Sequence, residues 1–161
     1  MDGSNTLNSE PVKITCRNVW KIYGPNPTHF FNQGNGAVDD PSSLLQQMIE
    51  SEHIPAACNV SFDVHLGEIF VIMGLSGSGK STMVRCLSRL VEPSAGEVFL
   101  DDQNLLQVSE RELIELRRHK MGMVFQNFGL LPHQTVLENV SFPLKVQGIA
   151  RSEREKRAEK V

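Results

Sequence analysis

The sequence predicts an α/β fold, and three features along the chain support this prediction. An apolar run at 69–73 has the composition of a buried strand, a glycine-rich loop follows at 74–81, and an amphipathic helical pattern begins at Lys80. Strand-like and helix-like segments then alternate toward the C-terminus, which is typical of α/β domains. With 161 residues, the chain is long enough for one domain with a substantial core.

Two further strands are predicted before the glycine-rich loop. Residues 12–23 alternate apolar and polar side chains at their start, as a half-buried strand does. Residues 60–66 alternate again, and Gly67 and Glu68 then turn the chain into the apolar run at 69–73. Residues 1–10 are polar, and we expect them to be a disordered lead-in.

The stretch 24–57 between these two strands is predicted to be an insertion that contains a short helix. Ser43 and Gln46 have the spacing of a capping box, and Pro55 follows the expected end of the helix. One face of this helix is expected to be apolar and consists of Leu44, Leu45, Met48 and Ile49.

Four helices and two strands are predicted after the loop. The first helix covers 80–91, a short strand covers 97–100, and a buried-type strand covers 121–125. Three later helices are indicated by Ser or Thr followed three residues on by Glu, a capping-box pattern that occurs at Ser109–Glu112, Thr135–Glu138 and Ser152–Glu155. The last of these helices reaches Val161 without a glycine or proline stop signal.

Composition excludes several functional classes. A balance of 16 Lys and Arg against 19 Asp and Glu shows no basic excess, so a general nucleic-acid role is not expected. No apolar run approaches the roughly 20 residues that a membrane-spanning helix needs. Cys16, Cys58 and Cys86 lie far apart without a CxxC pair, and we expect them to be reduced, partly buried thiols.

The loop at 74–81 matches the pattern G-x-x-x-x-G-K-[ST] at every fixed position. Its residues are Gly74, Leu75, Ser76, Gly77, Ser78, Gly79, Lys80 and Ser81. Glycines allow the backbone N–H groups to turn inward and surround phosphate oxygens, and the start of the following helix adds a favourable dipole. The pattern therefore predicts a nucleotide-phosphate site, with Lys80 reaching the β- and γ-phosphates and the Ser81 hydroxyl ligating Mg²⁺.

The residues around the loop resemble those of a known family. The segments IYG at 22–24, VSFDVHLGEIFVIMGLSGSGKST at 60–82 and MGMVFQNFGLLPHQTVLENV at 121–140 are similar to ATP-binding subunits of ABC transporters. The similarity is strongest to the subunits of glycine betaine/proline betaine importers, which also carry an insertion between the tyrosine and the loop. The resemblance implies an incomplete P-loop NTPase fold with edge antiparallel strands, part of a parallel core sheet, and the start of a helical subdomain at 127–161. Residues 11–161 would then be the N-terminal part of an ABC ATP-binding domain.

The resemblance also implies roles for individual residues. Tyr23 would stack on the adenine, and a structural role at the strand end is the alternative. Gln126 would reach Mg²⁺ and the attacking water, and Thr82 would join Ser81 in the nucleotide site. The cofactors implied are ATP and Mg²⁺, and 128–140 would lie where a membrane subunit docks.

Parts that ATP hydrolysis requires in this family are missing from the sequence. No LSGGQ-like loop occurs, and no Asp-Glu pair or histidine follows a suitable strand, so no catalytic residue is identified. One segment resembles an apolar strand that ends in Asp: VFLDD at 98–102, with Asp101. This segment is expected to lie in a hairpin. All five histidines are expected to be surface residues. The full-length subunit would be an ATPase, whereas the 161-residue chain alone is expected to be inactive and poorly stable.

The resemblance implies a second ATP-binding subunit and transmembrane permease subunits as partners, at the cytoplasmic face of the inner membrane. Two other functional classes stay open from the residues alone. One is a regulator that binds nucleotide without hydrolysing it, which fits the chain as given. The other is a small-molecule P-loop kinase, which would need an arginine-bearing lid and an acceptor pocket that the sequence after Gln126 does not show.

Overall fold

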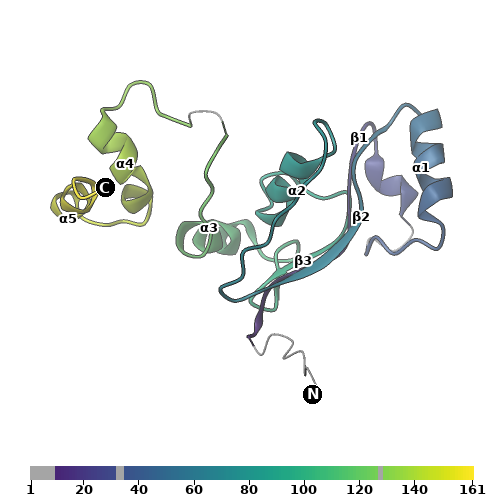
Figure 1. The fold of residues 1–161 in the computed structure, drawn as a ribbon, viewed down its shortest axis with the longest axis horizontal. Helices are drawn as coiled ribbons and strands as arrows, with labels where there is room; N and C mark the ends of the chain where they lie inside the picture. The colour runs from purple at the N-terminus through teal and green to yellow at the C-terminus, as the bar shows by residue number, and fades with distance from the viewer. Residues whose placement is uncertain (1–9, 32–34, 127–128) are drawn as a thin grey trace, which may run out of the picture. The chain divides into compact units, whose positions relative to one another are not determined.

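The structure is a computed structural model that describes residues 10–31, 35–126 and 129–161, so the lead-in expected at 1–10 lies almost wholly outside the described residues. The chain divides into two compact units, one ending at Val108 and one covering Ser109–Val161 (Figure 1). Within the described ranges, none of the helices combines the length and the apolar character needed to cross a membrane.

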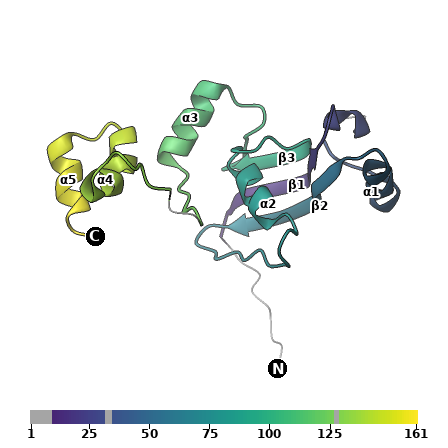
Figure 2. The ribbon, with the colours of Figure 1, turned by 90° about the horizontal axis from the view of Figure 1, so that it is seen from above.

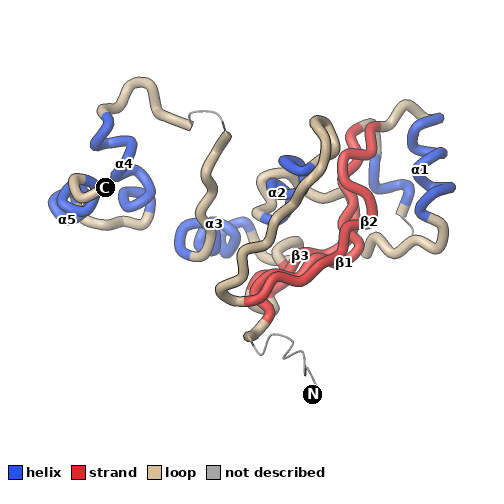
Figure 3. The backbone as a smooth tube through the Cα atoms, in the orientation of Figure 1, coloured by secondary structure: helices blue, strands red, loops and turns tan. Residues whose placement is uncertain are grey.

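The first unit is built on an antiparallel sheet. Its strands are β1 (Val12–Tyr23), β2 (Ile54–His65), β3 (Ala95–Leu100) and β4 (Gln103–Asn104), in the spatial order β2-β1-β3-β4 (Figure 3). The strand expected at 12–23 is confirmed, and the strand expected at 60–66 begins earlier, at Ile54. Asp101 and Asp102 form the turn between β3 and β4, which confirms the predicted hairpin.

The insertion folds onto this sheet. It contains a short 3-10 helix, η1 (Pro27–Phe30), and α1 (Pro41–Glu50). The expected cap at Ser43 is wrong: the Asp40 carboxylate accepts from the backbone N–H groups of Ser42 and Ser43, so the helix begins at Pro41, whose fixed φ suits a first helical position.

The apolar face of α1 packs against β1. Leu44 and Met48 are buried together with Trp20 and Ile22, and the Trp20 ring N–H donates to the Gly36 carbonyl at 2.8 Å. Ile49, which was expected on the same apolar face, is 64% exposed. In Figure 1, α1 lies on one side of β1 and β2, and α2 (Lys80–Leu87) lies on the other.

The apolar run at 69–73 does not form the predicted strand. It leaves the end of β2 as an extended segment without a hydrogen-bonded neighbour among the described residues (Figure 3). Ile69 and Met73 are 89% and 85% exposed, while the Phe70 ring stacks on Phe62 of β2 with centroids 4.6 Å apart. A strand is defined by pairing with another strand, so an apolar segment without such a neighbour stays irregular.

The second unit contains three helices, α3 (Glu110–His119), α4 (Val136–Val146) and α5 (Arg151–Ala158). The capping boxes at Ser109 and Thr135 are confirmed. The third is wrong, because α5 begins at Arg151 and Ser152 lies inside the helix, whose N-cap Ala150 makes no side-chain cap. The strand expected at 121–125 is absent as well, and Val124 is fully exposed.

The three cysteines are free thiols in the first unit, as expected. Cys16 and Cys86 are buried and Cys58 is half-buried. Burial raises the pKa of Cys16 to about 12 and that of Cys86 to about 11, because the thiolate form would lose its hydration.

The packing of α1 on the sheet can be tested with Met48→Ala. The buried Met48 side chain leaves a cavity when truncated, so we expect the free energy of unfolding to fall by about 2–5 kcal/mol. Ile49→Ala on the same helix is the matched control and is expected to change it by less than about 0.5 kcal/mol. Urea unfolding followed by circular dichroism measures both. Equal losses in the two variants would contradict this packing.

The buried thiols predict a loss of stability at high pH. Above the ordinary thiol pKa of 9.0 the unfolded chain loses protons that the folded chain keeps on Cys16 and Cys86, so the free energy of unfolding falls as pH rises from 9 toward 11. The slope is about 1.4 kcal/mol per pH unit for each buried thiol. We expect a variant with both residues changed to Ser to lack this thiol-dependent slope in urea unfolding. An unchanged slope in that variant would contradict the assignment.

Candidate phosphate-binding site

The glycine-rich loop presents a row of backbone N–H groups that make no hydrogen bond to the residues that the structure describes. Ser78 N donates to Leu75 O at 3.2 Å, which tightens the loop. Within the described part of the chain no hydrogen bond is made by the backbone N–H groups of Ser76, Gly77, Gly79, Lys80 and Ser81. These five N–H groups run from the loop into the first turn of α2. Such a group of unpaired donors at the start of a helix is typical of sites that bind phosphate oxygens.

Lys80 lies at the first position of α2 and folds back over the loop. Its ammonium donates to the carbonyl oxygens of Gly74, at 2.8 Å, and Leu75, and to the Ser78 hydroxyl at 3.3 Å. The ammonium therefore lies above the same loop whose N–H groups are unpaired. Ser81 is exposed one residue further along the helix, and Thr82 is half-buried.

Gly79 attaches the loop to the sheet. It has φ +86°, and a Cβ at this position would lie 1.7 Å from the Ala56 carbonyl oxygen in β2. Only glycine allows this approach, because any other residue would need both a left-handed backbone and space that Ala56 occupies. The loop is thereby held against the beginning of β2.

Tyr23 ends β1 near the same part of β2. Its cross-strand partner is Ile54, which precedes Ala56 by two residues, or about 7 Å along a strand. The Tyr23 side chain is 44% exposed, and the Lys21 ammonium lies 4.9 Å from its ring centroid. The structure thus brings Tyr23 and the phosphate loop to one end of the β1–β2 pair, and it leaves part of the Tyr23 ring accessible.

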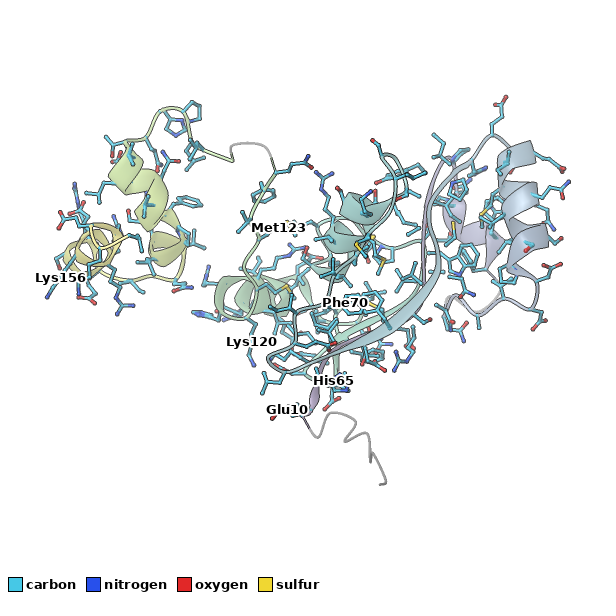
Figure 4. The ribbon with its side chains drawn as sticks, viewed as in Figure 1. Glu10, His65, Phe70, Lys120, Met123 and Lys156 are labelled. Atoms are coloured by element: carbon cyan, nitrogen blue, oxygen red, sulfur yellow. The ribbon has the colours of Figure 1, made fainter. Side chains whose placement is uncertain are left out.

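A cavity of about 590 Å³ with a mixed polar and apolar lining borders the loop. It is bounded by β2, by the extended segment at 70–73, and by Gly77, Gly79 and Lys80 of the loop. Figure 4 shows Phe70 beside the sheet, where its ring stacks on Phe62. The loop residues Gly77, Gly79 and Lys80 thus form one wall of this cavity.

Gln126 belongs to the second unit. It is exposed and follows the irregular segment 121–125. The start of the segment expected to dock a membrane subunit, Phe128, lies outside the described residues. No group of three or more His, Cys, Asp or Glu side chains that could hold a metal ion occurs in the ranges that the structure describes.

Two residues near Tyr23 were missed by the sequence reasoning. His53 was expected at the surface, but it is only 7% exposed, because the end of the insertion folds over it. The sequence could have identified Lys21 as a neighbour of the Tyr23 ring, because residues two apart on a strand share a face and Lys21 precedes Tyr23 by two. No local sequence signal indicates the position of His53, because its partners lie in other segments.

Comparison with known families gives a match to the family described as ABC transporter, over residues 57–161. Among solved structures, the ATP-binding cassette MJ0796, determined as a dimer in a post-hydrolysis state with ADP and Pi, superposes with a TM-score of 0.69. It is 34% identical, and the match covers 91% of this chain and 54% of that one.

Curated relatives are ATP-binding proteins of transport systems. The trimethylamine N-oxide transport ATP-binding protein of Pelagibacter ubique is 50% identical over 88% of this chain and 40% of its own. The glycine betaine/carnitine transport ATP-binding protein of Listeria monocytogenes is 57% identical over 91% of this chain and 36% of its own. The chain spans roughly two fifths of the length of the curated relatives it matches.

The close approach of the loop to β2 predicts different effects for two loop glycines. Gly77 and Gly79 have similar positive φ values, +79° and +86°, but only Gly79 meets another atom. Gly77→Ala should cost about 1–2 kcal/mol of unfolding free energy from backbone strain alone. We expect Gly79→Ala to cost at least about 1 kcal/mol more in urea unfolding, because Ala56 must move. Similar losses in both variants would show that the loop does not rest on β2.

Proposed function

The chain belongs to the ABC transporter family, and on this premise we propose that it is the ATP-binding part of a transporter importing betaine-type quaternary amines. In this proposal ATP binding and hydrolysis drive transport. The transport systems named for the relatives handle glycine betaine, proline betaine, carnitine and trimethylamine N-oxide. The observation that carries the proposal is the row of unpaired loop N–H groups beside the Lys80 ammonium, because such donors complement the negative charge of phosphate oxygens.

The loop would hold the β- and γ-phosphates. Gly74, Leu75, Ser76, Gly77, Ser78 and Gly79 supply the backbone that surrounds the phosphates. On binding, the Lys80 ammonium would exchange its contacts with the Gly74 and Leu75 carbonyls for contacts with phosphate oxygens, which bind it more strongly because they are charged. The start of α2 adds the positive end of the helix dipole.

Tyr23 would receive the adenine base. Its ring is partly exposed and lies at the end of the β1–β2 pair where Gly79 anchors the loop. A base stacked on an aromatic face is stabilised by about 1–3 kcal/mol. This placement of a stacking ring and a phosphate loop on one pair of strands supports the proposal that both ends of one nucleotide bind there.

Mg²⁺ would bind together with the nucleotide. When bound, it neutralises phosphate charge and polarises the phosphoryl group. The Ser81 hydroxyl fits such an ion, because Mg²⁺ prefers oxygen ligands and keeps several ligands from water and phosphate. We propose that Gln126 supplies its side-chain oxygen to the same ion and to the attacking water, and that Thr82 lies beside Ser81 in the nucleotide site.

The partners proposed are a second ATP-binding subunit and transmembrane permease subunits, at the cytoplasmic face of the inner membrane. The dimer of the cassette MJ0796 supports the first, and the transport-system names of the relatives support the second.

We also propose that this chain alone binds ATP without turning it over. Asp101 and Asp102, an acidic pair that follows β3, lie in the hairpin turn between β3 and β4.

The proposal predicts that Lys80→Ala weakens the binding of magnesium–ATP about 10- to 100-fold, since a hydrogen bond to a charged group contributes about 1.5–3 kcal/mol. Isothermal titration calorimetry on the 161-residue chain measures this effect. Lys145→Ala, a lysine of α4 outside the loop, is the control and should bind as the wild type does. Equal affinity of wild type and Lys80→Ala would refute the assigned role. Steady-state phosphate release, or phosphotransfer to a small-molecule acceptor, would refute the non-hydrolysing behaviour proposed for this chain.

A further inference from the structure

His53 is a buried histidine whose two ring nitrogens both face backbone carbonyls. Nδ1 lies 2.9 Å from Ser51 O, just past the end of α1, and Nε2 lies 2.8 Å from Pro25 O, which is 28 residues away in the chain. The imidazolium form donates to both carbonyls, and the neutral ring with its proton on Nε2 can accept from the Ser51 hydroxyl at 3.1 Å. In these two forms Nε2–H donates to the Pro25 carbonyl.

The same ring lies directly against Gly24. A Cβ on Gly24 would come within 2.3 Å of His53 Cδ2, and Gly24 has φ +146°. The Phe30 ring meets the imidazole edge-to-face, with centroids 5.0 Å apart, and so fixes its plane. Gly24 and Pro25, the two residues after Tyr23, are therefore held by one buried ring.

His53 is also connected to Tyr23 through the sheet. Ile54, the residue after His53, is the cross-strand partner of Tyr23 at the end of the β1–β2 ladder. His53 is therefore next to Tyr23 by two routes. It contacts Gly24 and Pro25, which follow Tyr23 in the chain, and it precedes Ile54, which pairs with Tyr23 across the ladder. Lys21 covers part of the Tyr23 ring from the same strand. These contacts hold the backbone that carries Tyr23.

We propose that His53 is a positioning residue for base recognition: it fixes Tyr23 as a rigid stacking platform, so that the insertion sets the affinity for the nucleotide base. This inference rests on the proposed nucleotide-binding function. It assigns to α1 and His53 a role in binding that the phosphate loop alone does not supply. A preorganised ring gains affinity because the entropy of ordering it is lost on folding rather than on binding.

The proposal predicts that a change at His53 affects the affinities for two triphosphate-containing ligands differently. Magnesium–ATP carries the base, whereas magnesium tripolyphosphate engages the loop alone. We expect His53→Ala to weaken magnesium–ATP about 5- to 30-fold, within the range that one base–aromatic stack allows, and tripolyphosphate by less than about twofold. Isothermal titration calorimetry on the 161-residue chain, with a thermal melt of each variant, measures both.

Three further variants make the test specific. His53→Gln keeps an N–H donor that can reach Pro25 O, and we expect it to recover most of the ATP affinity. In a Tyr23→Ala background, His53→Ala should have no further effect on ATP, because it acts through Tyr23. His65→Ala is the control: His65 ends β2 at the opposite end from Ile54, and Figure 4 shows it away from α1, so ATP affinity should be unchanged.

If His53→Ala does not fold, Gly24→Ala carries the same test, because its Cβ would displace the ring while keeping the histidine. Equal losses for ATP and tripolyphosphate, or an undiminished effect of His53→Ala in the Tyr23→Ala background, would overturn the inference while leaving the phosphate site intact. Failure of the wild type to bind either ligand would instead overturn the proposed function, and this inference with it.

Discussion

The contact between Gly79 and the Ala56 carbonyl is the constraint on which the candidate site depends. It fixes the last turn of the phosphate loop to the beginning of β2, and it requires a residue without a Cβ. Because β2 pairs with β1 over most of its length, the loop is also placed relative to Tyr23. The views in Figures 1 and 2 show the strands that carry these contacts with α1 and α2 packed around them. A loop held in this way presents its N–H groups in a fixed array before any ligand arrives.

Features set by neighbouring residues could be predicted from the sequence. The phosphate loop, the caps at Ser109 and Thr135 and the β3–β4 hairpin each depend on residues within a few positions of one another. The two strands predicted at 69–73 and 121–125 are wrong, because apolar runs indicate burial but do not indicate a pairing partner. Both segments stay extended and irregular in the described structure, and their apolar side chains are largely exposed. The fold class nevertheless agrees with the solved cassettes that the chain resembles.

The helix within the segment 24–57 was predicted, but β2 already begins at Ile54, and the contacts of the segment were not predicted. The sequence indicated a helix with an apolar face, and α1 does bury Leu44 and Met48 against Trp20. Its start was misplaced, because Ser43 and Asp40 are both plausible caps and only the backbone path decides between them. His53 was misassigned to the surface for a similar reason. Carbonyls satisfy the ring nitrogens of this buried histidine, and one of them belongs to Pro25, which is 28 residues away in the chain.

The insertion and the phosphate loop converge on the first three residues of β2 from opposite sides. His53 precedes Ile54 and supports the Tyr23 end of the ladder, while Gly79 rests on Ala56 two residues later. In a nucleotide the base and the phosphates are covalently joined, so the two halves of a binding site gain full affinity only when their separation is fixed. A short stretch of one strand that carries both contacts fixes that separation more rigidly than two independent loops would. In the proposed nucleotide site, the insertion would therefore stiffen the element that relates the base to the phosphates.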